Sequence, residues 1–312
     1  MEQNYTFLLK LAIVLAVAHS AGILSVKLKQ PAVLGQIVAG IILGIGVFEK
    51  TELIENFGQI GVILLMFVAG LETDVEELTR SIKSSSLIAF GGVIVPAALV
   101  FVAVMVIIPT QSVTSAIFLG VVTTATSVSI SVQTLREIDK LKSRQGVMIM
   151  GAAIIDDVIG IVLLTILVGI VRPGMGSSIQ TVLVDVMALF FIICISGFLL
   201  LKIINYYEKK HEIGDLVIIF AIVVCFVLSF ISEEFGVAAI TGAYFAGVIF
   251  SMTPYKHKVS HEMNRFSGLL FTPVFFVSIG MDIDVMAALN AVGVGSIRSE
   301  ERRVGKECRY RW

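Results

Sequence analysis

Two adjacent aspartates, Asp156 and Asp157, lie in the middle of an otherwise apolar stretch from about residue 146 to residue 171. The stretch is long enough to cross a bilayer, for which about 20 residues suffice. A charged side chain at mid-membrane costs at least about 2.5–3.5 kcal/mol on insertion scales, so two in succession need a functional reason. The pair predicts an ion or proton site that faces a watery cavity. The alternative is a buried structural carboxylate held by hydrogen bonds.

A second polar feature lies one apolar stretch earlier, in residues 113–132. Its centre carries four hydroxyl side chains: Thr123, Thr124, Thr126 and Ser127. Hydroxyl side chains compete with the helical backbone for hydrogen bonds, so we expect a break or an unwound turn near Ala125. Broken helices in transporters present carbonyl oxygens and half-helix ends to a bound ion. Ordinary Ser/Thr packing between membrane helices is the alternative.

Taken together, these residues predict a site for a transported Na⁺, because small hard cations prefer oxygen ligands. The aspartate pair would supply negative charge, and Thr126 and Ser127 would supply neutral oxygens. Adjacent helical residues point about 100° apart, so one carboxylate can face the cavity while the other faces a neighbouring helix. Three further side chains are candidates to line the cavity: Thr123, Thr124 and Gln133.

A proton and a metal cation would compete for the same carboxylate oxygens in such a site. Removal from water and a like-charged neighbour both favour the protonated form of a carboxyl group in general. If the site opens to either side of the membrane only when it is occupied, the two ions are exchanged without further machinery.

The composition indicates an all-α polytopic membrane protein and excludes a soluble enzyme. Of 312 residues, 57% are hydrophobic and only 15% are charged, against about 25% charged in soluble domains. We expect no enzymatic activity, no cofactor and no nucleic-acid partner. Apolar runs predict ten membrane spans: Tyr5–Val26, Pro31–Phe48, Leu53–Leu71, Ser86–Ile108, Val113–Val132, Val147–Val171, Ile179–Ile204, Ile213–Ile231, Gly236–Met252 and Phe266–Met281. An eleventh begins near Asp284.

The distribution of Lys and Arg predicts the orientation of these spans. Fourteen of these residues follow odd-numbered spans and only two, Lys50 and Arg172, follow even-numbered ones. By the positive-inside rule the ends of the odd spans are cytoplasmic and the N-terminus is outside. The protein is therefore predicted to be a multi-pass protein of a plasma membrane.

The C-terminal residues differ sharply from the rest of the chain. Between Arg298 and Trp312, nine of fifteen residues are charged. We interpret residues 1–295 as one transmembrane domain that is incomplete at its C-terminus, and residues 296–312 as a non-native or frame-shifted tail, excluded from fold reasoning.

Five stretches, taken in order, resemble the second family of monovalent cation:proton antiporters, and especially the bacterial NapA-type Na⁺/H⁺ antiporters. The stretches are residues 31–40 (Pro-Ala-Val-Leu-Gly-Gln-Ile-Val-Ala-Gly), 64–74 (Leu-Leu-Met-Phe-Val-Ala-Gly-Leu-Glu-Thr-Asp), 124–131 (Thr-Ala-Thr-Ser-Val-Ser-Ile-Ser), 153–160 (Ala-Ile-Ile-Asp-Asp-Val-Ile-Gly) and 275–281 (Phe-Phe-Val-Ser-Ile-Gly-Met). The similarity extends from about residue 5 to residue 295.

The resemblance implies an NhaA-like inverted-repeat transporter fold with broken crossing helices, in a homodimer, of which the second repeat is incomplete here. It implies an elevator-like shift of a core part. It also implies that Asp157 is the main carrier of the cation and proton, that Asp156 is its partner, and that Thr126 and Ser127 lie at the helix crossover. The family has a lysine in the span after Met281 that pairs with the first aspartate; here the charged tail takes that place.

Na⁺(Li⁺)/H⁺ antiport is thus the predicted function, but ion choice depends on cavity size, which the sequence does not reveal. A K⁺/H⁺ antiporter or a glutathione-gated type of K⁺ efflux system is the main alternative. A channel or sensor built on the same fold is another. An intramembrane aspartyl protease is a remote one, because it needs its two aspartates on facing helices, whereas Asp156 and Asp157 share one.

Overall fold

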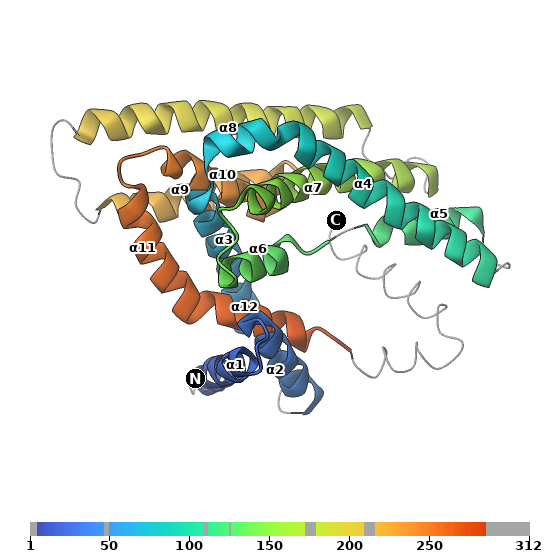
Figure 1. Ribbon diagram of the computed structural model, residues 1–312, viewed down its shortest axis with the longest axis horizontal. Coiled ribbons are helices and arrows are strands. Elements are labelled where there is room, and N and C mark those ends of the chain that lie inside the picture. Colours follow the sequence, from blue (N-terminus) through green and yellow to red (C-terminus); the bar gives the residue numbers. More distant parts are fainter. Residues whose placement is uncertain are drawn as a thin grey trace. The chain divides into compact units, whose positions relative to one another are not determined.

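The computed structural model describes residues 5–46, 50–108, 112–124, 126–171, 179–208 and 216–284. The described residues form helices joined by short connections, and no strand occurs among them (Figure 1). The helices are α1 (Thr6–Lys27), α2 (Ala32–Gly46), α3 (Glu52–Glu72), α4 (Val75–Ile107), α5 (Val113–Val122), α6 (Val128–Glu137), α7 (Arg144–Val171), α8 (Ile179–Glu208), α9 (Leu216–Glu234), α10 (Ala239–Ser251), α11 (Lys256–Phe266), the π-helical η1 (Ser267–Phe271) and α12 (Thr272–Met281).

Each of the ten predicted spans coincides with one of these helices or with a pair of them. Within the described ranges, six helices are long and apolar enough to cross a membrane by themselves: α1, α3, α4, α7, α8 and α9. The all-α polytopic class is therefore confirmed. The expected eleventh span beyond Asp284 and the charged tail at 296–312 lie outside the described residues.

Two compact units make up the chain. One contains residues 1–58 and 273–312, and the other contains residues 59–272. In the first unit, α1, α2, the start of α3 and α12 share a core of buried apolar side chains: Val14, Ala18, Leu43, Ile54, Val274 and Val277. The connection before α3 is joined to the end of α12 by an ion pair, in which Lys50 Nζ lies 2.8 Å from an Asp282 carboxylate oxygen.

In the second unit, α4 packs along α7, α5 packs on α4, and α10 packs on α9 and α8 (Figure 1). Helices α3 and α10 cross at two glycines. The position that a Cβ of Gly70 would take is blocked by the carbonyl oxygen of Tyr244, and that of Gly247 by the carbonyl oxygen of Phe67. Only a residue without a side chain fits at either position, so the two backbones touch directly.

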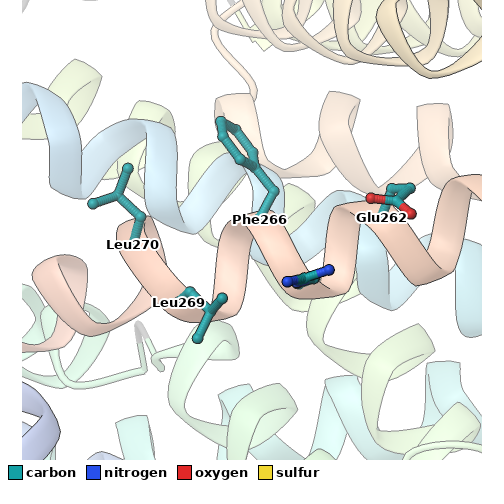
Figure 2. Close-up of a pocket in the computed structure, with 5 residues that line it drawn as sticks. Glu262, Phe266, Leu269 and Leu270 are labelled. Atoms are coloured by element: carbon teal, nitrogen blue, oxygen red, sulfur yellow. The ribbon is translucent and has the colours of Figure 1, made fainter. Parts of the chain in front are cut away.

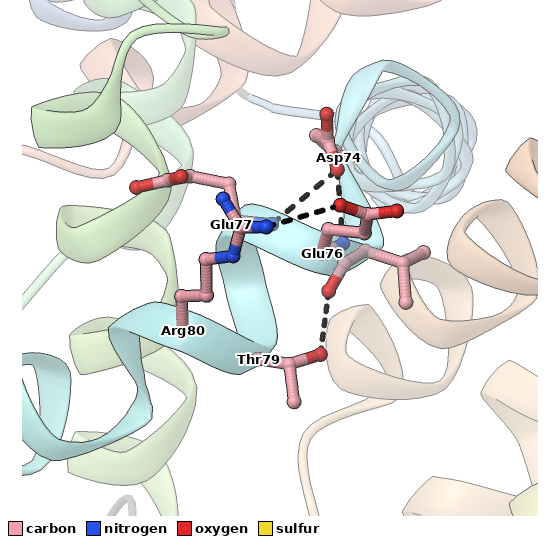
Figure 3. A network of polar contacts seen from close by, with 6 residues as sticks. Asp74, Glu76, Glu77, Thr79 and Arg80 are labelled. Atoms are coloured by element: carbon pink, nitrogen blue, oxygen red, sulfur yellow. Dashed lines mark hydrogen bonds and ion pairs between the residues drawn. The ribbon is translucent and has the colours of Figure 1, made fainter.

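Helix α4 begins eleven residues earlier than the span predicted from Ser86. Asp74 is its N-cap: one carboxylate oxygen accepts hydrogen bonds from the backbone N–H of Glu76 at 2.9 Å and of Glu77 at 3.3 Å (Figure 3). Such a cap stabilises the first turn by satisfying amides that have no partner within the helix. The 33 residues of α4 are about 50 Å long, against a hydrocarbon core of about 30 Å.

A polar helix, α11, occupies most of the connection between the predicted spans that end at Met252 and begin at Phe266. Its polar sequence escaped a prediction based on apolar runs. Helix α11 continues through η1 into α12 without a break. The π-turn ends at Phe271, two residues before Pro273. Proline lacks an N–H, and its ring would clash with the carbonyl four residues earlier in a regular α-helix. A locally widened turn accommodates that proline.

Candidate functional site

The predicted break in the fifth span is confirmed. Helix α5 ends at Val122, and α6 begins at Val128 after the N-cap residue Ser127. The hydroxyl of Thr123 donates to the carbonyl of Gly120 at 2.8 Å, and that of Thr124 donates to the carbonyl of Val121 at 2.7 Å. These side chains take up carbonyls at the end of α5, which is the competition between hydroxyls and helix backbone that the sequence suggested.

The break lies against α7 at the aspartate pair. The hydroxyl of Thr126 donates a hydrogen bond to a carboxylate oxygen of Asp156 across 3.2 Å. Two residues thirty positions apart are thus brought together by the packing of the broken helix on α7. The chain between the half-helices supplies the hydroxyl, and the middle of α7 supplies the carboxylate.

The packing of α4 on α7 fixes the third wall of the site. The hydroxyl of Ser85 on α4 donates to the carbonyl of Met148 on α7 at 3.1 Å. A Cβ on Gly151 would lie 2.8 Å from the hydroxyl oxygen of Ser85. The two helices therefore approach closely between one and about two turns before the aspartate pair, and residues from the middle of α4 line the same cavity as Asp156.

A cavity of about 160 Å³ lies between α4, the start of α6 and α7. Asp156, Thr126 and Ser127 all line it. The remaining lining residues are Ile88, Ala89, Gly92, Val128, Ser131, Val132, Ile149, Met150, Ala152 and Ala153. A carboxylate and three hydroxyl side chains thus face a space whose other walls are apolar or small. This size and these oxygens suit a small cation with part of its water.

The two half-helix ends at the break, the C-terminus of α5 and the N-terminus of α6, carry partial charges of opposite sign. Ser127 makes no side-chain cap for α6, so the first amide N–H groups of α6 do not donate to that hydroxyl. The N-terminus of a helix carries a partial positive charge and its C-terminus a partial negative one. The start of α6 therefore favours the negative charge of Asp156, and the end of α5 favours a cation.

Asp157 lies on α7 next to Asp156 but does not line the cavity. Its side chain is half-buried. Among the described residues, no hydrogen bond or ion pair of its carboxylate is found, in contrast to Asp156. The two carboxylates therefore have different surroundings, as the angle between adjacent helical residues led us to expect.

The other predicted lining residues are not among those that line this cavity. Thr123 and Thr124 bond to the backbone of α5, and Gln133 donates to a carboxylate oxygen of Glu137 at 3.0 Å within α6. Three residues of α4 that the sequence did not identify do line it: Ile88, Ala89 and Gly92. A Cβ on Gly92 would meet nothing within 4 Å. The adjacent glycines at 91 and 92 mark a part of α4 without side-chain bulk, but the sequence does not show which of the two faces the cavity.

Sequence comparisons relate the chain to membrane transporters. The family described as "Sodium/hydrogen exchanger, transmembrane" matches residues 13–297. A probable Na⁺/H⁺ antiporter of Bacillus cereus, GerT, is 41% identical over 283 residues, which are 89% of this chain and 74% of GerT. The Na⁺/H⁺-K⁺ antiporter GerN of the same organism is 38% identical over 283 residues, 90% of this chain and 72% of GerN.

A solved structure shares the fold. The sodium proton antiporter MjNhaP1 of Methanocaldococcus jannaschii superposes with a TM-score of 0.65, covering 94% of this chain and 75% of that chain. The sequence identity is 19%, so this similarity speaks for a common architecture and not for a common site.

Proposed function

This chain belongs to the sodium/hydrogen exchanger transmembrane family, and we propose on that basis that it is a secondary active Na⁺(Li⁺)/H⁺ antiporter. The contact that carries the proposal is the 3.2 Å hydrogen bond between Thr126 and Asp156, made where a broken helix meets an aspartate pair at a cavity. The printed names of GerT and GerN support the same activity.

Asp157 is the carrier of the cation and the proton in this proposal. Its carboxylate has no hydrogen-bond partner within the described ranges, and an uncompensated charge inside a bilayer is costly. A proton or a cation on the carboxylate removes that cost. Asp156 is held by Thr126 and directs the cation from the cavity to its neighbour. Because one carboxylate cannot hold a proton and a cation at once, each ion displaces the other.

Exchange follows if the site is open to one side of the membrane at a time. We propose an alternating-access cycle in which the loaded site, with either H⁺ or Na⁺, passes between the two faces and the empty, charged site does not. The cost of carrying an unpaired carboxylate through the bilayer provides the physical reason. Each cycle therefore exports a cation and admits protons, or the reverse, according to the gradients.

A direct test uses proteoliposomes of the purified protein with an imposed pH gradient. Addition of Na⁺ or Li⁺ is expected to dissipate the gradient, and Asp157→Asn is expected to abolish the response. Asp185→Asn on α8 is the matched control, since it removes a half-buried carboxylate outside the cavity. Unchanged flux in Asp157→Asn, or no flux with any monovalent cation in the parent protein, would rule out the proposal.

K⁺/H⁺ exchange is the second candidate, and one observation favours it. GerN, which is 38% identical to this chain, carries K⁺ in its printed name. The same proteoliposomes distinguish the two, because a K⁺ exchanger responds to K⁺ at concentrations where Na⁺ and Li⁺ give little response. A cavity of about 160 Å³ accommodates either ion with some of its water.

We further propose that residues 1–295 form the transmembrane domain of a homodimer in a bacterial plasma membrane, with the N-terminus outside. The family resemblance supports the dimer, and the excess of Lys and Arg after odd-numbered spans supports the orientation. Several relatives come from bacteria, among them Bacillus cereus and Enterococcus hirae.

A further inference from the structure

A second hollow of the molecule lies far along the chain from the aspartate pair. It is a groove of about 280 Å³ at the junction of α11 and η1, lined by Glu262, Arg265, Phe266, Leu269 and Leu270. Within α11, Glu262, Arg265 and Phe266 are spaced i, i+3 and i+4, which places them on one face of that helix. Leu269 and Leu270 follow in the π-helical η1. Figure 2 shows Glu262 at one end of this segment and Leu269 and Leu270 towards the other, with Phe266 between them.

The groove has a charged end and an apolar end. Arg265 and Glu262 are both exposed, and Phe266 and Leu269 are 48% and 59% exposed. Among the described residues neither Arg265 nor Glu262 makes an ion pair or hydrogen bond. A cation and an anion one turn apart are therefore both available to a ligand, next to an uncovered aromatic ring and an uncovered leucine.

The position of the groove along the chain matches the edge of a bilayer. Helix α11 is polar, and it continues through η1 into the apolar α12. From Glu262 to Phe266 the α-helix rises about 6 Å, which matches the headgroup layer of one leaflet, roughly 5–8 Å. Charged side chains at such a boundary lie among lipid headgroups while the neighbouring apolar ones contact acyl chains.

We propose that this groove binds a membrane phospholipid whose headgroup carries both a phosphate and a primary ammonium, as in phosphatidylethanolamine. The Arg265 guanidinium binds the phosphate through paired N–H donors, and the Glu262 carboxylate accepts hydrogen bonds from the ammonium. Phe266 and Leu269 contact the upper part of the acyl chains. A groove of about 280 Å³ suits a headgroup and not a whole lipid.

The two charges together discriminate between lipid classes. A purely anionic headgroup such as phosphatidylglycerol satisfies Arg265 but meets the like charge of Glu262. Phosphatidylcholine presents the phosphate, but its methylated ammonium has no N–H to donate to Glu262. Only the primary ammonium satisfies both side chains, so the preference order is a property of the Glu262–Arg265 pair and not of the bilayer as a whole.

The test is competitive lipid retention, measured by native mass spectrometry on the purified protein exchanged into detergent with equal amounts of the three lipids. The parent protein is expected to retain phosphatidylethanolamine in preference to the other two. Arg265→Gln is expected to lower retention of all three by about fivefold, the factor that corresponds to roughly 1 kcal/mol per cation at a membrane surface. Glu262→Gln is expected to remove the preference for phosphatidylethanolamine while retaining phosphatidylglycerol.

Lys256→Gln is the matched control, because it removes a cation from the same helix outside the groove and should leave the lipid pattern unchanged. A thermal melt of each variant verifies that it is folded. Equal retention of the three lipids by the parent protein, or a parent-like pattern in both groove variants, would overturn the proposal. Lipid retention is measured without ion transport. The lipid proposal can therefore fail while the antiport proposal holds, and the reverse is also true.

Discussion

Within the part of the chain that the structure describes, Thr126 supplies the one hydroxyl that donates to the aspartate pair, through a hydrogen bond to Asp156 of 3.2 Å. A hydrogen bond to a charged group is worth about 1.5–3 kcal/mol. We expect Thr126→Val to raise the Na⁺ concentration for half-maximal exchange about tenfold, while Thr126→Ser keeps the hydroxyl and stays near the parent value. The measurement is Na⁺-dependent dissipation of a pH gradient in proteoliposomes.

The control for that experiment is Thr123→Val, which removes a hydroxyl from the same break. Thr123 donates only to the carbonyl of Gly120 and lies outside the cavity. If both valine variants weaken Na⁺ dependence equally, the effect belongs to the shape of the break and the role of Thr126 at the site is refuted.

Gly92 is the second residue whose function depends on its exact place. It lines the same cavity as Asp156, and a Cβ built there meets nothing within 4 Å. Gly92→Leu is therefore expected to fold normally but to fill much of the space of about 160 Å³ and to suppress exchange strongly. Flux and thermal stability measured on the same preparation separate these effects.

Gly91→Leu provides a closely matched comparison. Gly91 is the neighbour of Gly92 on α4, it has equally open surroundings, and it does not line the cavity. We expect this variant to transport normally. Equal losses in both variants would mean that leucine disturbs α4 itself, and the cavity would then have no demonstrated part in transport.

At the scale of elements, the break between α5 and α6 could be predicted, because four hydroxyl side chains concentrate at Thr123–Ser127 and such side chains compete locally with helix hydrogen bonds. The walls of the cavity could not. Whether Ile88 or Gly92 faces Asp156 depends on how α4 lies on α7, and that is set by contacts such as Ser85 with Met148, sixty-three residues apart. The periodicity of apolar residues indicates local secondary structure, but it does not indicate which residues of distant helices are in contact.

The two underestimated helices have a common cause. The first turns of α4 and the whole of α11 carry charged residues such as Glu76, Arg80 and Lys258, so a search for apolar runs stops before them. Local signals existed nevertheless. Asp74 followed by Glu76 and Glu77 is a typical start of a helix. A prediction that used this N-cap signal together with the apolar runs would have started α4 at its observed beginning.

The N-cap of α4 can be tested by its contribution to stability. Asp74 accepts hydrogen bonds from the amides of Glu76 and Glu77. We expect Asp74→Ala to destabilise the protein by about 1 kcal/mol, seen as a lower midpoint of thermal unfolding in detergent, and Asp74→Asn to retain most of the stability. Glu76→Gln, which removes only an exposed ion pair with Arg80, should change stability by less than about 0.5 kcal/mol. Equal midpoints for the alanine and asparagine variants would contradict a capping role.

At the scale of the whole molecule, the proposed orientation predicts which loops each side of the membrane can reach. Lys142, between α6 and α7, and Glu234, at the end of α9, are both exposed. In a protein whose Cys194, Cys225 and Cys308 are replaced, a membrane-impermeant thiol reagent added outside intact cells should label Glu234→Cys and not Lys142→Cys. In inside-out vesicles the pattern should reverse. Labelling of Lys142→Cys in intact cells would invert the orientation.

The charge distribution that predicts this orientation needs no tertiary structure, because the membrane sorts loops by their Lys and Arg residues as the chain inserts. The division into two compact units is different. Its boundaries fall inside α3, after Gly58, and at Thr272, where η1 gives way to α12. Neither boundary coincides with a loop. The sequence therefore has no stretch of linker-like residues, rich in Gly, Pro or polar side chains, that would mark the division.

The crossing of α3 and α10 at Gly70 and Gly247 has a mechanical consequence. Carbonyl oxygens occupy the positions that side chains would take at both glycines. No side chain lies between the two backbones there that could change rotamer if one helix moved along the other. A displacement of even one residue would drive a neighbouring side chain into a peptide group. We therefore expect α3 and α10 to move as one rigid piece near this crossing in any rearrangement of the unit that contains it.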